Sequence, residues 1–352
     1  MTYTEYNIDS TFMKQQTVSE ILMFVKTNLY KGETLVFKSV QESVDPNKIH
    51  LYKELFEKLK HLDIIWFAHP DYKNEDWLKQ YNFVTYVDYL QYQTYTHNIN
   101  HNTSWNFDSN RILCHTGRPY KFNRTKLIMM LSERGLLKHC EYSYRVPNKQ
   151  MQDACRKFFV DWSDEDFYTW MSEHHRAPIG VDLYSINDNI VDDFMPGLNL
   201  SNTLSQSSLF NISVESWFCE VLSSQDPFLT EKTWKPILHN LPFIHVGQPG
   251  SLNKLKNLGF KTFEEYLLVP YDHITDQEQR MSAVIENIAY WFDHIHDHKD
   301  NIINDTQHNY QHFLKIMHDL ENELDSKGIK ELLPTSIEYL LSRYPQYRLT
   351  FT

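Results

Sequence analysis

The stretch LFNISVESWFCEVLSSQDPFLTEKTWKPILHNLPFIHVGQPGSLNKLKNLGF, residues 209–260, decides the fold class of this chain. Its apolar runs at 209–214 and 241–246 alternate with runs of helical period at 230–239 and 251–258. Strands that alternate with helices are typical of a parallel α/β sheet. The turn between the second strand and the second helix is expected at residues 247–250, which hold two glycines and a proline.

Polar residues follow the predicted strands and begin the first predicted helix. In open α/β sheets, ligands bind at the carboxyl ends of strands and at helix N-termini. A carboxylate suits a ribose diol, and an ammonium beside backbone N–H groups suits a diphosphate. We therefore predict a nucleotide-binding rim made of Glu215, Thr230, Glu231, Lys232 and Gly247.

Pro236 limits where the first of these helices is expected to begin. Proline fits only the first turn of a helix, because it lacks an N–H and clashes with the preceding turn. The helix proper is therefore expected to start near Thr233, with Glu231 and Lys232 in the loop before it or in its first turn.

Three elements of this stretch resemble the donor-binding half of a glycosyltransferase. They are ISVES at 212–216, FLTEK at 228–232 and LPFIHVG at 241–247. The α1,3-fucosyltransferase family has a Phe-Glu-Asn-Ser element, Thr-Glu-Lys and Val-Pro-Val-Val-x-Gly in the same order. Similar blocks occur in viral and bacterial glycosyltransferase-like proteins. The resemblance covers the middle third of the chain, and Ser216 stands where the family has asparagine.

The resemblance implies a GT-B fold, in which two Rossmann-like α/β domains face a cleft. It implies an inverting, metal-independent transfer of a sugar from a nucleoside-diphosphate sugar to an acceptor hydroxyl, with no cofactor. Glu231 would hold the ribose, and Lys232 would stabilise the departing diphosphate. We expect an acceptor-side domain at 1–108, a donor domain at 109–300, and a helical tail at 301–352 that packs back on the first domain.

A second anion site is predicted where RILCHTG, RPYKFN and RTKLIMMLSERGLL follow one another over 111–137. This order reads as a strand, a basic loop and a helix closed by Gly135, and a helix N-terminus favours anions. A solvated basic turn is the alternative. The fucosyltransferase family has a donor-phosphate arginine in this part of its donor domain. Arg124 matches it best, and Arg118 is the second choice.

The first domain is expected to supply the base that deprotonates the acceptor. Its α/β character rests on helical runs at 17–29 and 50–61 and strand runs at 33–40, 63–68 and 83–87. His69 and Asp71, just past the strand at 63–68, are the candidates. An ordinary turn after a strand is the alternative for both, and Glu42 at another strand end is a further candidate.

Two other polar clusters are better explained without a metal. Ser163 before Asp164 and Asp166 predicts a helix N-cap with acidic residues in the first turn. His294 and His298 share one face of a helix expected over 276–300, without the order of a zinc motif. We therefore predict no metal site.

Composition narrows the functions left open. The chain has 352 residues, 9 glycines and a net charge of −12, and no GxGxxG or Walker loop can be written. This charge makes a glycan or small-molecule acceptor a better prediction than nucleic acid.

The 4 cysteines are scattered, and no membrane span or signal peptide is evident, so a cytoplasmic protein is expected. The alternatives to a glycosyltransferase acting on a glycan or small molecule are a non-catalytic glycosyltransferase-like scaffold that binds nucleotide or glycan, and a DNA-modifying sugar transferase.

Overall fold

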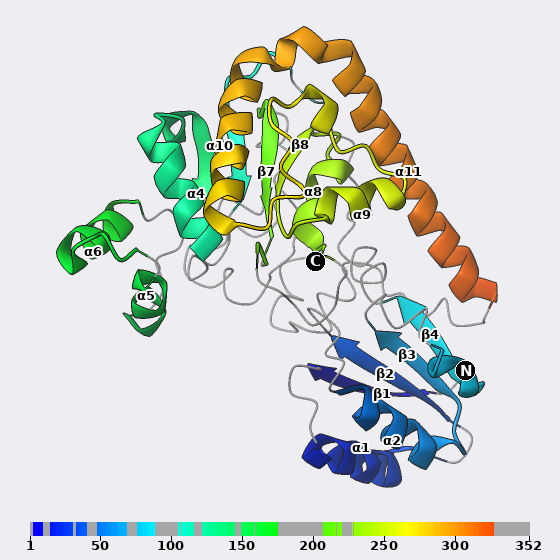
Figure 1. Cartoon of the computed structure of the whole chain (residues 1–352). Coiled ribbons are helices and arrows are strands. Elements are labelled where there is room, and N and C mark those ends of the chain that lie inside the picture. The colour runs from blue at the N-terminus through cyan, green and yellow to red at the C-terminus, as the bar shows by residue number, and fades with distance from the viewer. Residues whose placement is uncertain are drawn as a thin grey trace, which may run out of the picture. The chain divides into compact units, whose positions relative to one another are not determined.

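The computed structural model of the chain contains two compact units, each with its own parallel sheet (Figure 1). The first unit comprises residues 1–97, 221–226 and 316–352, and the second comprises 98–220 and 227–315. The structure describes residues 3–9, 15–30, 33–40, 48–68, 76–88, 105, 107–115, 122–144, 149–157, 159–174, 207–215, 217–219, 227 and 229–326. The domain limits predicted from the sequence stay predictions.

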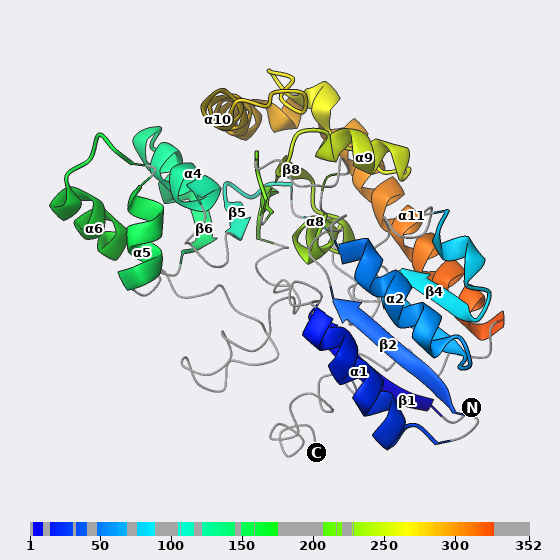
Figure 2. The same cartoon turned by 60° about the horizontal axis from the view of Figure 1, so that its bottom comes forward.

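The first unit is a sheet of four parallel strands in the order β1-β2-β3-β4, with helices between them. The chain moves in one direction across this sheet, and right-handed crossovers then place the connecting helices on the same face. Figures 1 and 2 show α1 and α2 on that face. The elements are β1 (Tyr3–Asp9), α1 (Gln15–Asn28), β2 (Thr34–Val40), α2 (Ile49–Leu59), β3 (Ile64–Ala68), η4 (Leu78–Gln80) and β4 (Val84–Asp88).

Large aromatic side chains fill the space between this sheet and its helices. The ring of the fully buried Trp66 on β3 lies 5.2 Å from Tyr52 and 5.0 Å from Phe56, both on α2. The five elements predicted in this region are confirmed to within two residues at each end. The sequence does not predict β1, because the run YTEYNID is too polar to read as a buried strand.

The second unit is a four-stranded parallel sheet in the order β6-β5-β7-β8. From β5 the chain continues to β6 on one side of it, and later returns to β7 on its other side and then to β8. The direction of strand addition therefore reverses between β5 and β7. That reversal is a topological switch point, the usual place for ligands in open α/β sheets. Right-handed crossovers then put α4 and α8 on opposite faces, and α10 packs against α4 (Figure 1). The elements are β5 (Ile112–His115), α4 (Phe122–Glu133), η5 (Leu137–His139), β6 (Cys140–Ser143), α5 (Lys149–Arg156), α6 (Asp164–Glu173), β7 (Phe210–Val214), α8 (Glu231–Leu238), β8 (Phe243–Val246), α9 (Ser251–Asn257), η6 (Glu264–Tyr266), α10 (Gln277–His294), η7 (Ile295–His298) and α11 (Lys299–Ser326).

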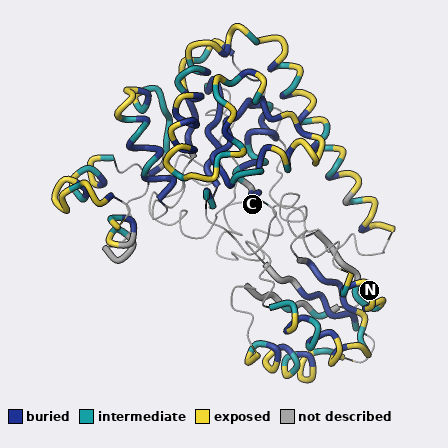
Figure 3. The backbone as a smooth tube through the Cα atoms, viewed as in Figure 1, coloured by how far each residue is buried: buried dark blue, intermediate teal, exposed yellow. Residues whose placement is uncertain are grey.

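The strands β7 and β8 of this sheet are covered on both faces. Every residue of β7 and β8 is buried (Figure 3), which explains the continuous apolar runs at 209–214 and 241–246. On one side, the Trp291 ring of α10 lies 5.1 Å from Phe210 and 5.9 Å from Phe263. The α/β class with parallel strands is thus confirmed, and the sheet order is compatible with a Rossmann-like fold.

Two predicted helix ends are confirmed. Ser163 caps α6, and its hydroxyl accepts the Asp166 N–H at 3.1 Å, while Asp164 pairs with Arg156 at 2.8 Å. At the end of α4, Gly135 has φ +69° and the Leu136 N–H bonds back to the Leu131 oxygen at 2.9 Å.

The predicted start of α8 is two residues late, and Glu231 and Lys232 lie in the first turn, one of the two positions expected for them. The helix begins at Glu231 rather than near Thr233, because the Thr230 hydroxyl caps it and accepts the Lys232 N–H. Pro236 lies inside the helix. There it removes the backbone bond that residue 236 would have made to residue 232.

The helix predicted over 276–300 is interrupted, so the pairing of His294 with His298 on one helical face is also wrong. α10 ends at His294, and residues 295–298 form the 3-10 helix η7. The His294 ring stacks on Tyr290 at 4.3 Å, whereas the His298 ring lies 5.2 Å from Tyr266. Of the predicted tail, α11 covers residues up to 326, and its packing on the first domain stays a prediction.

Asparagine side chains hold the segment 258–272, which carries Tyr271, a backbone partner of Arg280 in the site described below. The Asn287 amide donates to the Val269 oxygen at 2.7 Å and accepts the Val269 N–H at 2.8 Å. Asn309 on α11 does the same for Lys261, at 2.9 and 2.7 Å. Each asparagine therefore replaces one pair of a β-ladder, and α10 and α11 fix the path of the segment.

We expect Asn287→Ala to lower the free energy of unfolding by about 2–4 kcal/mol, because it leaves both backbone groups of Val269 without their partner. Urea unfolding measures the change. Glu286→Ala, at the exposed neighbouring position of α10, is the matched control and is expected to change stability by less than about 0.5 kcal/mol. Equal stabilities of the two variants would contradict this role of Asn287.

Candidate functional site

The carboxyl edge of the second sheet brings together residues from four elements. Glu215 follows β7, and its backbone N–H donates to the Val246 oxygen at the end of β8 (2.9 Å). The Asn123 side chain, in the first turn of α4, donates to the Glu215 backbone oxygen at 3.0 Å. The Glu215 carboxylate accepts the Thr230 N–H, just before α8, at 2.9 Å. The N-termini of α4 and α8 and the ends of β7 and β8 thus meet at Glu215.

The Glu215 carboxylate holds the start of α8. It is fully buried and accepts the Thr230 hydroxyl at 2.5 Å and the Thr233 hydroxyl at 2.6 Å, besides the Thr230 N–H. Bonds to a carboxylate are stronger than neutral ones, and the N-terminus of a helix favours a negative charge. In the described structure both carboxylate oxygens of Glu215 therefore accept hydrogen bonds from groups of the protein. A contact from Glu215 to a donor stays a prediction.

Lys232 places an ammonium at the same helix end. Its Nζ lies 3.3 Å from the Thr230 hydroxyl oxygen, and its backbone N–H donates to that oxygen at 3.3 Å. The side chain is half-buried. A cation at a helix N-terminus is opposed by the helix dipole, and a bound anion relieves that opposition. The start of α8 is therefore a candidate anion site.

Burial keeps His245 on β8 neutral. Its Nδ1 lies 3.4 Å from the Thr233 hydroxyl oxygen, which itself donates to Glu215, so Nδ1 carries the proton. Burial, with a smaller contribution from the Arg280 guanidinium, lowers the pKa of His245 from 6.5 to about 3. Among the described residues, Nε2 has no hydrogen-bond partner. The ring occupies the space beside Gly247, where a Cβ atom would lie 2.2 Å from Nε2.

Arg280 on α10 holds the loop after β8 through hydrogen bonds to its backbone oxygens. Its guanidinium is fully buried and donates to the Gly247 oxygen at 3.0 Å, to the Gln248 oxygen at 3.1 Å and to the Tyr271 oxygen. Its centre lies 5.2 Å from the Tyr271 ring and 5.6 Å from that of Phe218. The loop that carries Gly247 is thus anchored by a side chain 33 positions further along the chain.

The structure places some of the residues predicted from the sequence and leaves others outside its description. Thr230, Lys232 and Gly247 lie at the carboxyl edge with Glu215, and Arg124 is buried in the first turn of α4, 4% exposed. Glu231 is the first residue of α8, but its side chain is outside the described part. Four more lie outside the described residues: Arg118, His69, Asp71 and Glu42.

His245 and Arg280 are not predicted as site residues from the sequence, although each is an exception to the pattern around it. His245 interrupts the apolar run of β8. Arg280 is in helical register with Val284, Ile288 and Trp291, the buried face of α10. A charged residue at such a position is exceptional unless it is paired. That exception is the signal that could have found Arg280.

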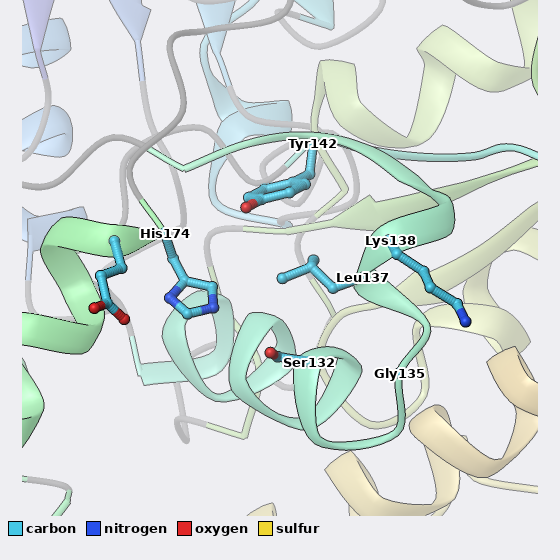
Figure 4. A pocket seen from close by; sticks show the side chains of 7 residues that line it. Ser132, Gly135, Leu137, Lys138, Tyr142 and His174 are labelled. Carbon is cyan, nitrogen blue, oxygen red and sulfur yellow. The ribbon is translucent and has the colours of Figure 1, made fainter.

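A separate pocket lies beside the edge strand β6 (Figure 4). Its volume is ≈ 330 Å³, and none of the residues predicted from the sequence lines it. The His174 ring stacks on Trp170 at 4.2 Å, and its Nδ1 lies 2.8 Å from the Trp170 oxygen. The pocket is lined by Ser132, Gly135, Leu137, Lys138, Tyr142, Glu173 and His174.

In the part of the chain that the structure describes, no group of three or more His, Cys, Asp or Glu side chains is arranged to hold a metal ion. No described helix is long and apolar enough to cross a membrane.

Comparisons with known proteins add nothing to this picture. Neither the protein-family models nor the curated protein sequences with which the chain was compared match it.

The shifted pKa of His245 predicts a pH-dependent stability. Between pH 6.5 and about 3 the unfolded chain binds a proton on this ring and the folded chain does not, so stability falls as the pH is lowered through this window. From pH 7.5 to 5.0 we expect the unmodified chain to lose about 2 kcal/mol more than His245→Asn, which keeps a donor toward Thr233 but does not titrate. Urea unfolding at both pH values measures the difference. Identical losses would mean that the ring does not stay neutral in the folded chain.

Proposed function

We propose that the chain is a glycosyltransferase that moves a sugar from a nucleoside-diphosphate sugar to an acceptor hydroxyl, with inversion and without a metal ion. The observation that carries the proposal is the start of α8, where Lys232 Nζ lies 3.3 Å from the capping hydroxyl of Thr230 at the carboxyl edge of the sheet. The resemblance to α1,3-fucosyltransferases supports the same assignment. A glycan or small molecule is the proposed acceptor.

The proposed reaction is a single displacement. The acceptor oxygen attacks the anomeric carbon while the bond from that carbon to the diphosphate oxygen breaks. The hydroxyl proton goes to a base, and the electron pair of the broken bond leaves on the diphosphate. One displacement at the anomeric carbon inverts its configuration.

The proposed contribution of the second unit is to stabilise the leaving group. Negative charge grows on the diphosphate as the bond breaks, and preorganised donors and cations at that position lower the barrier. Lys232 and the N-terminus of α8 supply such groups, and Arg124 lies in the first turn of α4 at the same sheet edge. Glu231 would hold the ribose. A cation supplied by side chains performs the role that Mg²⁺ or Mn²⁺ has in other transferases.

The proposed contribution of the first unit is the base. His69 or Asp71, just past β3, would accept the proton of the acceptor hydroxyl. The proposal thus includes the GT-B arrangement, with the acceptor bound by the first unit and the donor by the second.

The function is tested by incubating the chain with a panel of nucleotide sugars and measuring free nucleoside diphosphate, with and without a chelator. We expect release of diphosphate from one donor, nearly unchanged by the chelator. Activity that vanishes with chelator and returns with Mg²⁺ or Mn²⁺ would refute the metal-independent mechanism. Binding of a nucleotide sugar without release of diphosphate from any member of the panel would favour the non-catalytic scaffold.

Lys232→Ala is expected to weaken nucleoside-diphosphate binding by about 1.5–3 kcal/mol, or about 10- to 150-fold, because it removes a charge-assisted hydrogen bond. Calorimetric titration measures the affinity. Lys235→Ala, in the last turn of the same helix, is the matched control and should bind as the unmodified chain does. A folded Lys232→Ala variant with unchanged affinity would remove this lysine from the donor site.

A further inference from the structure

The geometry points to Arg280 as a positioning residue for the donor site, which holds the backbone of residues 247–250 in the orientation that receives the diphosphate. This inference rests on the proposed function. It adds a residue from α10, outside the three sequence elements that suggested the site.

The guanidinium collects backbone oxygens from two separate segments. Its Nε and one terminal nitrogen donate to Gly247 and Gln248, in the loop after β8. The other terminal nitrogen donates to Tyr271 and, at 3.4 Å, to Ile274. A planar group with five donors can serve both segments at once, and the ammonium of a lysine cannot. The loop after β8 is therefore fixed against the 271–274 segment through Arg280.

Because Arg280 holds these backbone oxygens, it also sets the direction of the N–H groups on the opposite side of the loop. The peptide bonds are trans, so the N–H of Gln248 points away from the Gly247 oxygen that faces Arg280. The next peptide group has no N–H, because residue 249 is proline. Further along, the Gly250 N–H donates to the Asp272 oxygen at 2.9 Å. Arg280 thus sets the direction of the Gln248 N–H, which points to the side of the loop opposite the guanidinium.

Stability alone does not explain a cation at this position. A fully buried charge carries a large desolvation cost, and apolar replacements of buried ion pairs are often neutral or stabilising. The Asp272 carboxylate lies 3.6 Å from the guanidinium. It also accepts the N–H groups of Leu252 and Asn253 at the start of α9, at 3.2 and 2.9 Å. We infer that the buried guanidinium of Arg280 serves to hold one conformation of the loop 247–250 beside the candidate anion site.

The test compares Arg280→Lys, which keeps the charge and loses the fork, with the unmodified chain and with Arg156→Lys. Arg156 is the matched control, because its guanidinium holds the oxygens of Phe159 and Trp162 between α5 and α6 in the same unit. The probes are UDP, GDP, ADP and CDP in calorimetric titration, and hydrogen exchange of peptides that cover 247–251 and 112–115.

We expect Arg280→Lys to weaken binding of the preferred diphosphate about tenfold or more, and to speed exchange over 247–251 while 112–115 stays protected. Arg156→Lys should change neither quantity. Equal affinity of Arg280→Lys and the unmodified chain, or exchange that rises equally in both peptides, would overturn the inference.

A measurement on the unmodified chain keeps the inference testable if Arg280→Lys does not fold. The bound diphosphate should slow hydrogen exchange over 247–251. Binding that leaves this exchange unchanged would overturn this inference but not the proposed function. If the unmodified chain binds none of the four diphosphates, the proposed function fails, and this inference fails with it.

Discussion

The second unit depends on the buried carboxylate of Glu215. Helix α8 has only eight residues and contains Pro236, so its own backbone bonds cannot hold it in place. Glu215 supplies what the helix lacks, because one carboxylate accepts the Thr230 N–H and the hydroxyls of Thr230 and Thr233. Since Glu215 directly follows β7, the helix start is fixed to the end of the central strand. The position of Lys232 follows from that attachment.

The carboxyl edge of the second unit differs in character from the core of the first. In the first unit, aliphatic and aromatic side chains form the described core, with Trp66 against Tyr52 and Phe56. In the second, the interior at the carboxyl edge is polar, because Glu215 gathers donors and Arg280 gathers acceptors. His245 lies between these groups and stays neutral, since burial and the Arg280 charge both oppose its protonation. Buried polar groups of this kind specify one arrangement more than they add stability.

The sequence predicts the elements whose burial repeats regularly and misses what distant contacts decide. The strands β7 and β8 are found because all their residues are buried and form apolar runs. Their carboxyl ends then locate Thr230, Lys232 and Gly247 by a rule of topology alone. The start of α8 is predicted two residues late, because Pro236 is a local signal, whereas Glu215 acts from 15 residues away. Arg280 is missed for the same reason, since its partners lie up to 33 residues distant.

In a parallel sheet, the positive ends of the helix dipoles lie at the carboxyl edge, and this arrangement needs no metal ion. Every crossover helix that follows a strand of this sheet begins at the carboxyl edge, so α4 and α8 both direct their N-termini there, although they lie on opposite faces. The proposed binding of the donor rests on residues of the second unit. The proposed deprotonation of the acceptor rests on a base from the first unit. The two halves of the proposed reaction are thus physically separable, and a chain that binds nucleoside diphosphate without transferring sugar would retain the first half and lack the second.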